Sequence, residues 1–440
     1  MVSRIPGVSP DSPGKGLLTC GRSKARCLYQ REPLAKEAFP VTHRVTGTYR
    51  TLAVGEETIK AFIPHPLPPR NPPLVIDGRL AELHSTACAA VGRLAVAGVM
   101  APSADWFLYG FVRKDAVLSS QIEGTQATLM DVLTYEATRK PDRPADVQDV
   151  CNHVDALTFA RAEIARSKGL PLCTRLLCMA HKRLMHGTRG ADRQPGIIRT
   201  SLNWIGGSRP GNARFVPPPH DAVPKALDAL ERWLHDDDPL PPLVRAGLAH
   251  VQFETIHPFL DGNGRIGRLL ITLLLEHWGL LTTPLLYLSL AFKRHRAEYY
   301  RRLLDVRTRG DWEGWTEFYL QCVRESAEDG VGAATRLFAL LGRDRRALSR
   351  HTAATVTAVR LLDLLPEHPI VTLPRAMKLL ATTKPTAGKA IDALSKAGIL
   401  RETTGRQRDR IYAYDAYLKI LREDTALPAE TSAGESGGNR

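Results

Sequence analysis

Apolar residues recur with helical spacing through the middle of the chain, from Ala81 to Phe338. The clearest amphipathic stretches, each with one apolar helical face, are 221–235, 243–255 and 312–325. The most hydrophobic stretch, 266–292, is interrupted by charged residues and a proline. It is expected to be a buried helix followed by a loop, not a membrane span. The pattern predicts a mainly α fold.

Two segments break the helical pattern. Residues 64–73 are rich in proline and cannot be helical, so they are expected to form an extended lead-in to the first helix. Residues 196–207 and 213–219 are β-prone runs around a tip rich in Gly, Pro and Asn, which predicts a β-hairpin flap. An exposed strand of such a flap could align an extended target segment through main-chain hydrogen bonds.

The composition changes near residue 340, where a last, small α+β domain is predicted. Residues 371–380 and 384–397 indicate two short helices, and 399–414 indicate a strand, a charged turn and a strand. A helix-turn-helix with a wing is the simplest description. The residues that could contact DNA from its second helix and wing are Lys384, Thr386, Lys389, Lys396, Arg406, Arg408 and Arg410. A basic surface that binds protein, or packs on the rest of the chain, fits the pattern equally well.

Composition and charge set the wider frame. The 440 residues predict several domains: 1–40 a basic disordered segment, 41–150 an N-terminal region, 151–335 the helical core, 340–425 the winged helix and 426–440 a disordered tail. Seven cysteines form neither an even set nor paired CxxC motifs, which favours the reducing cytoplasm. The net charge of +14 indicates an anionic partner without naming it.

The most informative segment is 257–268, which reads H-P-F-L-D-G-N-G-R-I-G-R. Its D-G-N-G run alternates residues that tolerate positive φ, so successive backbone N–H groups can surround an oxyanion. This run opens onto a helical pattern, and a helix N-terminus also favours negative charge. Arg265 and Arg268 lie on one face of the first turn and suit a di- or triphosphate.

Two further side chains add chemistry to this cradle. Asp261 supplies a hard oxygen ligand for Mg²⁺, which usually binds through one or two carboxylates together with substrate phosphates. His257 has the pKa range of a general base for an incoming hydroxyl. Each residue alone has a plainer structural interpretation. Their combination beside the apolar Phe259 favours a phosphate site, because buried polar groups need a partner.

The segment 257–268 resembles the signature of the Fic (filamentation induced by cyclic AMP) domain, H-P-F-x-D-G-N-G-R-x-x-R, at every specified position. The resemblance implies transfer of AMP from ATP to a Ser, Thr or Tyr hydroxyl of a target protein. His257 would deprotonate the hydroxyl and Asp261 would hold Mg²⁺. In-line attack at the α-phosphorus would release pyrophosphate. The residues implied to hold the phosphates, including the Asn side chain, are Gly262, Asn263, Gly264, Arg265 and Arg268.

A second match lies upstream. Ser119 to Gly124 is similar to the inhibitory motif of the same family, [S/T]-x-x-x-E-[G/N]. Ser119 and Glu123 are an i, i+4 pair on one helical face, and Gly124 could end that helix in left-handed geometry. The resemblance implies that Glu123 pairs with Arg268 and prevents ATP from seating its γ-phosphate, so the enzyme would be autoinhibited.

The resemblance also implies further contacts. The flap would dock the target, with Ile205, Gly206, Gly207 and Ser208 facing the nucleotide. Tyr299, Tyr300 and Arg307 would lie near the adenosine, although adjacent tyrosines on a helix more often pack in a core. The target could be the chain itself. The chain could also form a homodimer.

Two hypotheses of different class remain at this point. The first is an autoinhibited AMP transferase whose winged helix recruits a partner or regulates the enzyme. The second is a DNA-binding transcriptional regulator that uses the Fic core as a nucleotide sensor. An intact His257 and Asp261 favour the enzyme, since a sensor needs no base. Relatives that transfer phosphate or phosphocholine, or remove AMP, stay open as alternatives, while the full G-N-G-R-x-x-R favours ordinary ATP orientation.

Overall fold

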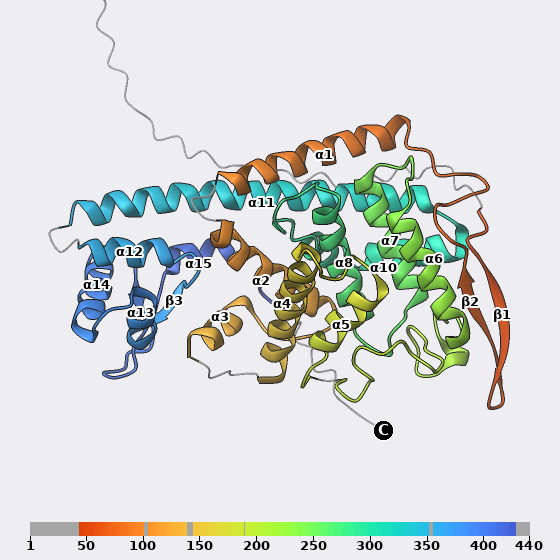
Figure 1. The fold of residues 1–440 in the computed structure, drawn as a ribbon, viewed down its shortest axis with the longest axis horizontal. Coiled ribbons are helices and arrows are strands. Elements are labelled where there is room, and N and C mark those ends of the chain that lie inside the picture. The colour runs from red at the N-terminus through yellow and green to blue at the C-terminus, as the bar shows by residue number, and fades with distance from the viewer. Residues whose placement is uncertain (1–43, 101–103, 139–143, 189, 352–354, 428–440) are drawn as a thin grey trace, which may run out of the picture. The chain divides into compact units, whose positions relative to one another are not determined.

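The computed structural model describes residues 44–100, 104–138, 144–188, 190–351 and 355–427. The expectations for 1–40 and for the tail from 428 lie outside these residues. The described part is mainly helical, with two small sheets (Figure 1). None of its helices is both long and apolar enough to cross a membrane.

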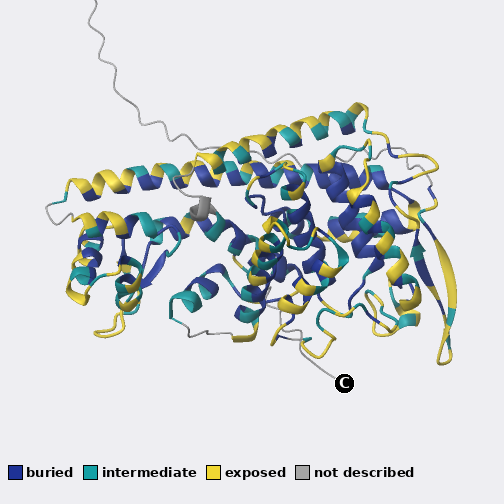
Figure 2. Cartoon of the chain, in the orientation of Figure 1, coloured by how far each residue is buried: buried dark blue, intermediate teal, exposed yellow. Residues whose placement is uncertain are grey.

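Helices α7 (Pro242–Ile256) and α8 (Asn263–His277) form the centre of the fold. They pack on each other, and α8 also contacts α2 (Ala104–Ile122), α4 (Pro144–Ala165) and α5 (Thr174–Leu184). Figure 2 shows the buried residues concentrated around these helices. This arrangement explains why α8 is apolar on most of its surface, as the sequence predicts.

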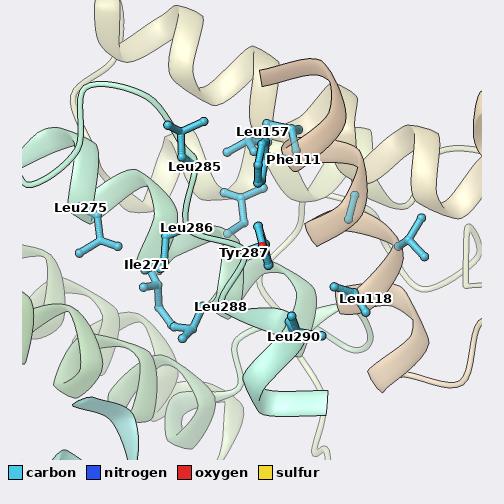
Figure 3. Packing of buried hydrophobic residues seen from close by; sticks show 14 of the residues in the cluster. Phe111, Leu118, Leu157, Ile271, Leu275, Leu285, Leu286, Tyr287, Leu288 and Leu290 are labelled. Carbon is cyan, nitrogen blue, oxygen red and sulfur yellow. The ribbon is translucent and has the colours of Figure 1, made fainter. Parts of the chain in front are cut away.

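The core around α8 is built from side chains far apart in the sequence. Ile271 and Leu275 of α8 lie in one cluster with Phe111 of α2, Leu157 of α4 and the segment 285–290 (Figure 3). Burying a side chain of this size stabilises the fold by about 1.5–3 kcal/mol. The cluster therefore holds α2 and α4, which bring acidic side chains to the start of α8, firmly against that helix.

The long helix α11 (Trp312–Ser349) packs along α1 (Gly78–Val99). It is far longer than the stretch 312–325 expected from the pattern, and it crosses the domain boundary expected between 335 and 340. Asp311 caps its start by accepting a hydrogen bond from the backbone N–H of Gly314. The remaining helices of this part are α3 (Leu129–Thr138), α6 (Val223–His235), α9 (Ser289–Arg294) and α10 (Arg296–Arg309).

The paired hairpin lies elsewhere than expected. Strands β1 (Gly47–Val54) and β2 (Glu57–Pro64) are antiparallel in a register that pairs Gly47 with Pro64, and the chain then runs without helix to α1, as predicted for 64–73. The flap expected at 196–219 is instead a loop closed by a single bridge between Ile205 and Phe215. Its prolines lack the N–H that a ladder requires, so two paired strands do not form there.

The C-terminal region, residues 355–427, has the predicted order of elements. Helices α13 (Leu373–Leu380) and α14 (Lys384–Lys396) precede strands β4 (Arg401–Glu402) and β5 (Ile411–Ala413). A strand missed by the sequence analysis, β3 (Ile370–Thr372), completes a sheet of order β3-β5-β4. Helices α12 (Val356–Leu364) and α15 (Asp415–Leu421) flank the region, and α15 contacts α11 and α2.

Candidate nucleotide-binding site

The loop between α7 and α8 has the backbone geometry of an anion cradle. His257 ends α7 in the left-handed region with a φ of 50°, and Gly262 caps the start of α8 with a φ of 76°. The positive φ favours glycine here, and a Cβ would also lie 2.9 Å from Met185 Sδ, so a larger residue would be strained in this turn. The loop delivers the unpaired N–H groups of the first turn of α8 to the same place.

Asn263 has a different use from the one expected. Its Oδ1 accepts a hydrogen bond from the backbone N–H of Phe259 (2.9 Å), and its Nδ2 donates to the Phe259 carbonyl (2.8 Å). The side chain is buried and ties Asn263 to Phe259 across the loop. In this state both polar ends of the side chain hold the backbone of Phe259, so neither is free for the phosphate contact that the resemblance implied.

Two residues missed by the sequence analysis fix the loop from outside. Arg199 is buried and donates to the carbonyls of His257 (2.8 Å) and Pro218 (2.6 Å). His181 stacks on Phe259, with ring centroids 3.8 Å apart. The Nδ1 of His181 accepts from the backbone N–H of Gly196 (2.8 Å), so its Nε2 carries the hydrogen and donates to the Asp261 carbonyl (2.9 Å).

Arg268 is bound by the upstream helix α2, as the resemblance implied. Its Nη2 lies 2.7 Å from Glu123 Oε1, while its Nε donates to Ser119 Oγ at 2.8 Å. Burial lowers the pKa of the Arg268 guanidinium, but Glu123, Tyr299 and Tyr300 together raise it by more, so the side chain stays charged. Gly124 follows with a φ of 94° and lets the chain leave the helix directly after the acid.

Glu123 lies against the first turn of α8. A Cβ on Gly264 would be 2.3 Å from Glu123 Oε1, so the glycine leaves room for the carboxylate at the helix N-terminus. A carboxylate in this place receives the favourable end of the helix dipole as well as the Arg268 charge. It therefore holds the position that an anionic ligand of the cradle would take.

Arg265 is also paired, which sequence spacing did not reveal. It forms a buried ion pair with Asp149 of α4, and the other carboxylate oxygen of Asp149 accepts from Thr125 Oγ1 (3.1 Å). The two motif arginines are thus each held by an acid: Arg268 by Glu123, just past the end of α2, and Arg265 by Asp149 on α4. They remain on one side of α8, as predicted, although neither is free in this state.

Asp261 carries the one carboxylate of the loop 257–262, and 49 % of its side chain is exposed. Its Oδ1 accepts from the backbone N–H of Gly262 at 2.6 Å. Within the ranges that the structure describes, no group of three His, Cys, Asp or Glu side chains could hold a metal ion. A single exposed carboxylate beside a phosphate cradle fits Mg²⁺, which takes its other ligands from phosphates and water.

His257 is held in its neutral form. Burial, together with the charges of Arg307 and Arg199, lowers the pKa of its imidazole to about 3. Its side chain remains 16 % exposed, and its Nδ1 lies 3.9 Å from Glu254 Oε2. A neutral imidazole that reaches solvent can accept a proton from an incoming hydroxyl.

The residues expected near the adenosine differ in exposure. Tyr299 is buried, and its hydroxyl is hydrogen-bonded to His250 Nε2 at 2.8 Å, so it packs in the core. Tyr300 is 40 % exposed. Arg307 is buried and donates to the Glu254 carbonyl (2.9 Å) and Thr255 Oγ1 (3.1 Å), which ties α10 to α7.

The flap residues lie at the rim. The loop positions expected to face the nucleotide are mostly exposed, and they are Ile205, Gly206, Gly207 and Ser208. Asn203 connects this loop to the motif by donating to the carbonyls of Phe259 (3.1 Å) and Leu260 (3.3 Å). The Asn203 side chain thus joins the flap to the backbone of the cradle.

A helical core that presents an anion cradle at the start of a buried helix, closed by an acid from a preceding helix, defines a Fic-type domain. Residues 171–275 match the Fic/DOC family, and residues 81–162 match the Fic/DOC family N-terminal region. The chain therefore contains a Fic domain preceded by the N-terminal region of that family, as the motif resemblance predicted.

Known relatives and a solved structure agree with this assignment. The chain is 37 % identical over 94 residues to a probable protein adenylyltransferase of Aquifex aeolicus, and 32 % identical over 142 residues to the protein adenylyltransferase fic-1 of Caenorhabditis elegans. These matches cover 21 % and 32 % of this chain, but only 27 % and 25 % of the relatives. The crystal structure of a Fic family protein from Desulfovibrio desulfuricans G20 shares the fold, with a TM-score of 0.51 at 24 % identity over 78 % of this chain and 98 % of that one.

Proposed function

We propose that this protein transfers AMP from ATP to a Ser, Thr or Tyr hydroxyl of a target protein, and that Glu123 holds it in an autoinhibited state. The observation that carries the proposal is the 2.7 Å ion pair between Glu123 and Arg268 at the start of α8. It lies beside a neutral His257 and an exposed Asp261. This chain matches about a quarter of the length of each of the two relatives, and their names give independent support.

The residues divide the reaction between them. His257 takes the hydroxyl proton while the hydroxyl oxygen bonds to the α-phosphorus, and the bond to the bridging oxygen of pyrophosphate breaks. The N–H groups at the start of α8 receive the phosphates, and Arg268 balances their charge once Glu123 has left. Asp261 would hold Mg²⁺, which when bound neutralises and orients phosphate oxygens.

Glu123 acts as the brake by occupying an anion position. Its carboxylate and an ATP phosphate are both negative and would share Arg268 and the first turn of α8. Two anions cannot take one position, so ATP binds productively only when Glu123 moves away. Because Gly124 has a positive φ, the backbone just after the acid is a natural place for such a movement.

The test identifies which group is transferred. The protein and its host lysate are incubated with Mg²⁺ and ATP labelled at either the α or the γ phosphate, using the wild type, Glu123→Gly and His257→Ala. The proposal predicts covalent α-label. The label should be strongest with Glu123→Gly, and with His257→Ala it should be at least roughly 100-fold weaker than with the wild type. A γ-label would instead indicate a kinase-like Fic enzyme, and release of AMP from a modified target would indicate the reverse reaction.

A second candidate function, DNA binding, rests on the C-terminal region. Helix α14 exposes Lys384 and Lys389, with Thr386 half-buried, and the β4–β5 turn exposes Arg406, Arg408 and Arg410. A helix and a wing with this charge suit the grooves and backbone of duplex DNA. In this alternative the protein is a transcriptional regulator and the Fic core senses nucleotide.

The alternative has its own measurement. Binding of the full chain to duplex DNA is measured against salt concentration, with Lys389→Ala, Arg408→Ala and, as control, the exposed Lys225→Ala on α6. DNA binding predicts a steep salt dependence, with a slope reduced by about 1 in each of the first two variants and unchanged in the control. Salt-independent binding, or none at low salt, removes this function. In either case the five free cysteines of the described chain favour a reducing compartment such as the cytoplasm.

A further inference from the structure

Buried polar atoms that lack a hydrogen-bond partner gather beneath His257. Within the described ranges they include Oε1 of Glu254 and the Nδ1 atoms of His257 and His250, which face the backbone of Glu254 and Gly267 but are too poorly placed for a full hydrogen bond. Such atoms are costly to bury and are rare in folded proteins. Three of them on two turns of α7 are therefore a feature that the fold alone does not require.

Glu254 occupies the centre of this group. It lies one helical turn before His257 and is 6 % exposed. Its Oε2 is 3.9 Å from His257 Nδ1. A Cβ on Gly267 would be 2.6 Å from Glu254 Oε1 and 3.1 Å from His250 Nδ1, so the α7–α8 contact leaves space for the carboxyl only because α8 has a glycine there.

The charged groups around the carboxyl are bound to other atoms. Arg268 is held by Glu123 and Ser119, while Arg307 donates to the backbone carbonyl of Glu254 and to Thr255. Burial raises the pKa of Glu254 to about 7, Arg268 and Arg307 lower it, and the Glu123 carboxylate raises it. Loss of Glu123 from the site therefore favours the ionised form of Glu254.

We propose that Glu254 is the positioning residue of His257. Its carboxylate accepts a hydrogen bond from the Nδ1–H of His257, which points Nε2 toward the target hydroxyl and stabilises the imidazolium that forms on proton transfer. The 3.9 Å separation shortens by about 1 Å to make this bond, and catalytic hydrogen bonds are often long in the absence of substrate. Glu254 keeps its charge throughout, and the proton that leaves the hydroxyl stays on Nε2.

This inference rests on the proposed AMP transfer and adds a residue outside the 257–268 motif. His250, whose Nε2 is engaged with the Tyr299 hydroxyl, lies beside Gly267 together with the Glu254 carboxyl. The buried surroundings strengthen the interaction of Glu254 with an imidazolium, because little water screens it. Nothing else in the described chain offers an acid to that side of the His257 ring at a comparable distance.

The kinetic test uses the Glu123→Gly protein as reference, so that the brake is absent. Glu254→Gln in this background is expected to lower kcat roughly 10- to 100-fold, the usual cost of losing a partner behind a functional histidine, while ATP affinity changes less than about twofold. Glu276→Gln is the matched control, because Glu276 is a part-buried acid at the far end of α8 that pairs with Arg161. It should leave kcat unchanged.

The pH profile separates positioning from a merely structural role. With Glu254 present, kcat/KM should fall as the pH drops through the pKa of this carboxyl, at or below about 7, because the protonated form cannot accept from His257. With Gln at 254 this acidic limb should vanish and leave a low, flat profile. An unchanged limb, or a loss of kcat matched by equal losses of ATP affinity and melting temperature, would overturn the inference.

A second measurement does not depend on AMP transfer. The ¹⁵N signals of the His257 ring, assigned with His257→Ala, report which nitrogen carries the hydrogen and how strongly it is bonded. The inference predicts an Nδ1–H form whose signal shifts in Glu254→Gln but not in Glu276→Gln. If the Glu123→Gly reference transfers no AMP, the proposed function fails, and these ring signals still decide the role of Glu254: no shift rejects it.

Discussion

Gln121 Nε2 donates a hydrogen bond of 3.1 Å to the backbone carbonyl of Thr425. Gln121 lies on the last turn of α2, two residues before Glu123, while Thr425 follows the last helix of the C-terminal region. Lys293 joins the same contact, since its Nζ donates to Gln121 Oε1 (2.6 Å) and to the carbonyl of Ala426 (3.1 Å). The C-terminal region therefore contacts the helix that carries the proposed brake.

Gln121→Leu should weaken autoinhibition. Loss of these hydrogen bonds, each worth about 0.5–1.5 kcal/mol, loosens the end of α2 that holds Glu123 against Arg268. Basal AMP transfer should rise roughly 2- to 10-fold, less than in Glu123→Gly, and the substitution should add nothing when Glu123 is already Gly. Gln321→Leu on α11, whose amide donates to Glu317 one turn earlier, is the control for a lost part-buried amide. Equal activation by both variants would argue against a specific tie.

Gly264→Ala should damage the site even when the brake is absent. The new Cβ would lie 2.3 Å from the position of Glu123 Oε1, which is also the expected position of an ATP phosphate. In the Glu123→Gly background, ATP affinity measured by calorimetry should fall at least about 10-fold. Gly332→Ala on α11 meets no atom within 4 Å and serves as the control. Unchanged ATP affinity in Gly264→Ala would mean that the phosphate lies elsewhere.

Asp149→Ala should destabilise the fold by removing the partner of Arg265. Breaking a buried pair leaves an uncompensated charge, which costs about 3–5 kcal/mol. Denaturant unfolding measures this loss in the free energy of unfolding, and Arg265→Met added to Asp149→Ala should restore part of it. Asp221→Ala, which removes the exposed partner of Arg50, should have little effect. A small effect of Asp149→Ala would show that the pair contributes little.

His181 should make stability depend on pH. Burial lowers the pKa of its imidazole to about 4, from an ordinary value of 6.5. Between these two pH values the unfolded chain binds a proton that the folded chain does not, so the free energy of unfolding falls as the pH drops from 6.5 toward 4. The contribution approaches 1.4 kcal/mol per pH unit. His181→Phe should reduce the measured slope by about this amount, whatever its overall stability, and an unchanged slope would contradict the assignment.

How far the sequence predicts the site depends on how local its contacts are. His257, Asp261 and the two arginines lie within one turn and one loop, so their chemistry follows from order and spacing. The motif is also contacted by two distant residues: Asp149 lies 116 residues from its partner Arg265, and Arg199 lies 58 residues from His257. No pattern in a single sequence reveals such pairs. Glu254 is closer, at one turn before His257, but a lone acid on an apolar helix gives no sign that it faces an imidazole.

The fold shows the same division. Helices α6, α7 and α13 to α14 follow apolar periodicity and were predicted near their observed bounds. The hairpin of β1 and β2 was missed, although its β-branched and aromatic residues around Gly55 are a usable signal. The flap was predicted as paired strands because its residues are β-prone. Its prolines, and the hydrogen bond from Arg199 to the His257 carbonyl of the motif, leave it with one bridge. Strand β3 has three residues and is too short for any pattern to reveal.

The most direct test of the account compares the rate of α-label transfer in the wild type, Glu123→Gly and Glu123→Gln, with ATP affinity measured in parallel. If the Glu123 carboxylate occupies the phosphate position at Arg268, Glu123→Gly should show the fastest transfer, and Glu123→Gln should show an intermediate rate because it removes the charge but keeps the side chain. Equal rates of α-label transfer in all three proteins, each of which still binds ATP, would contradict the central claim that this ion pair controls the site.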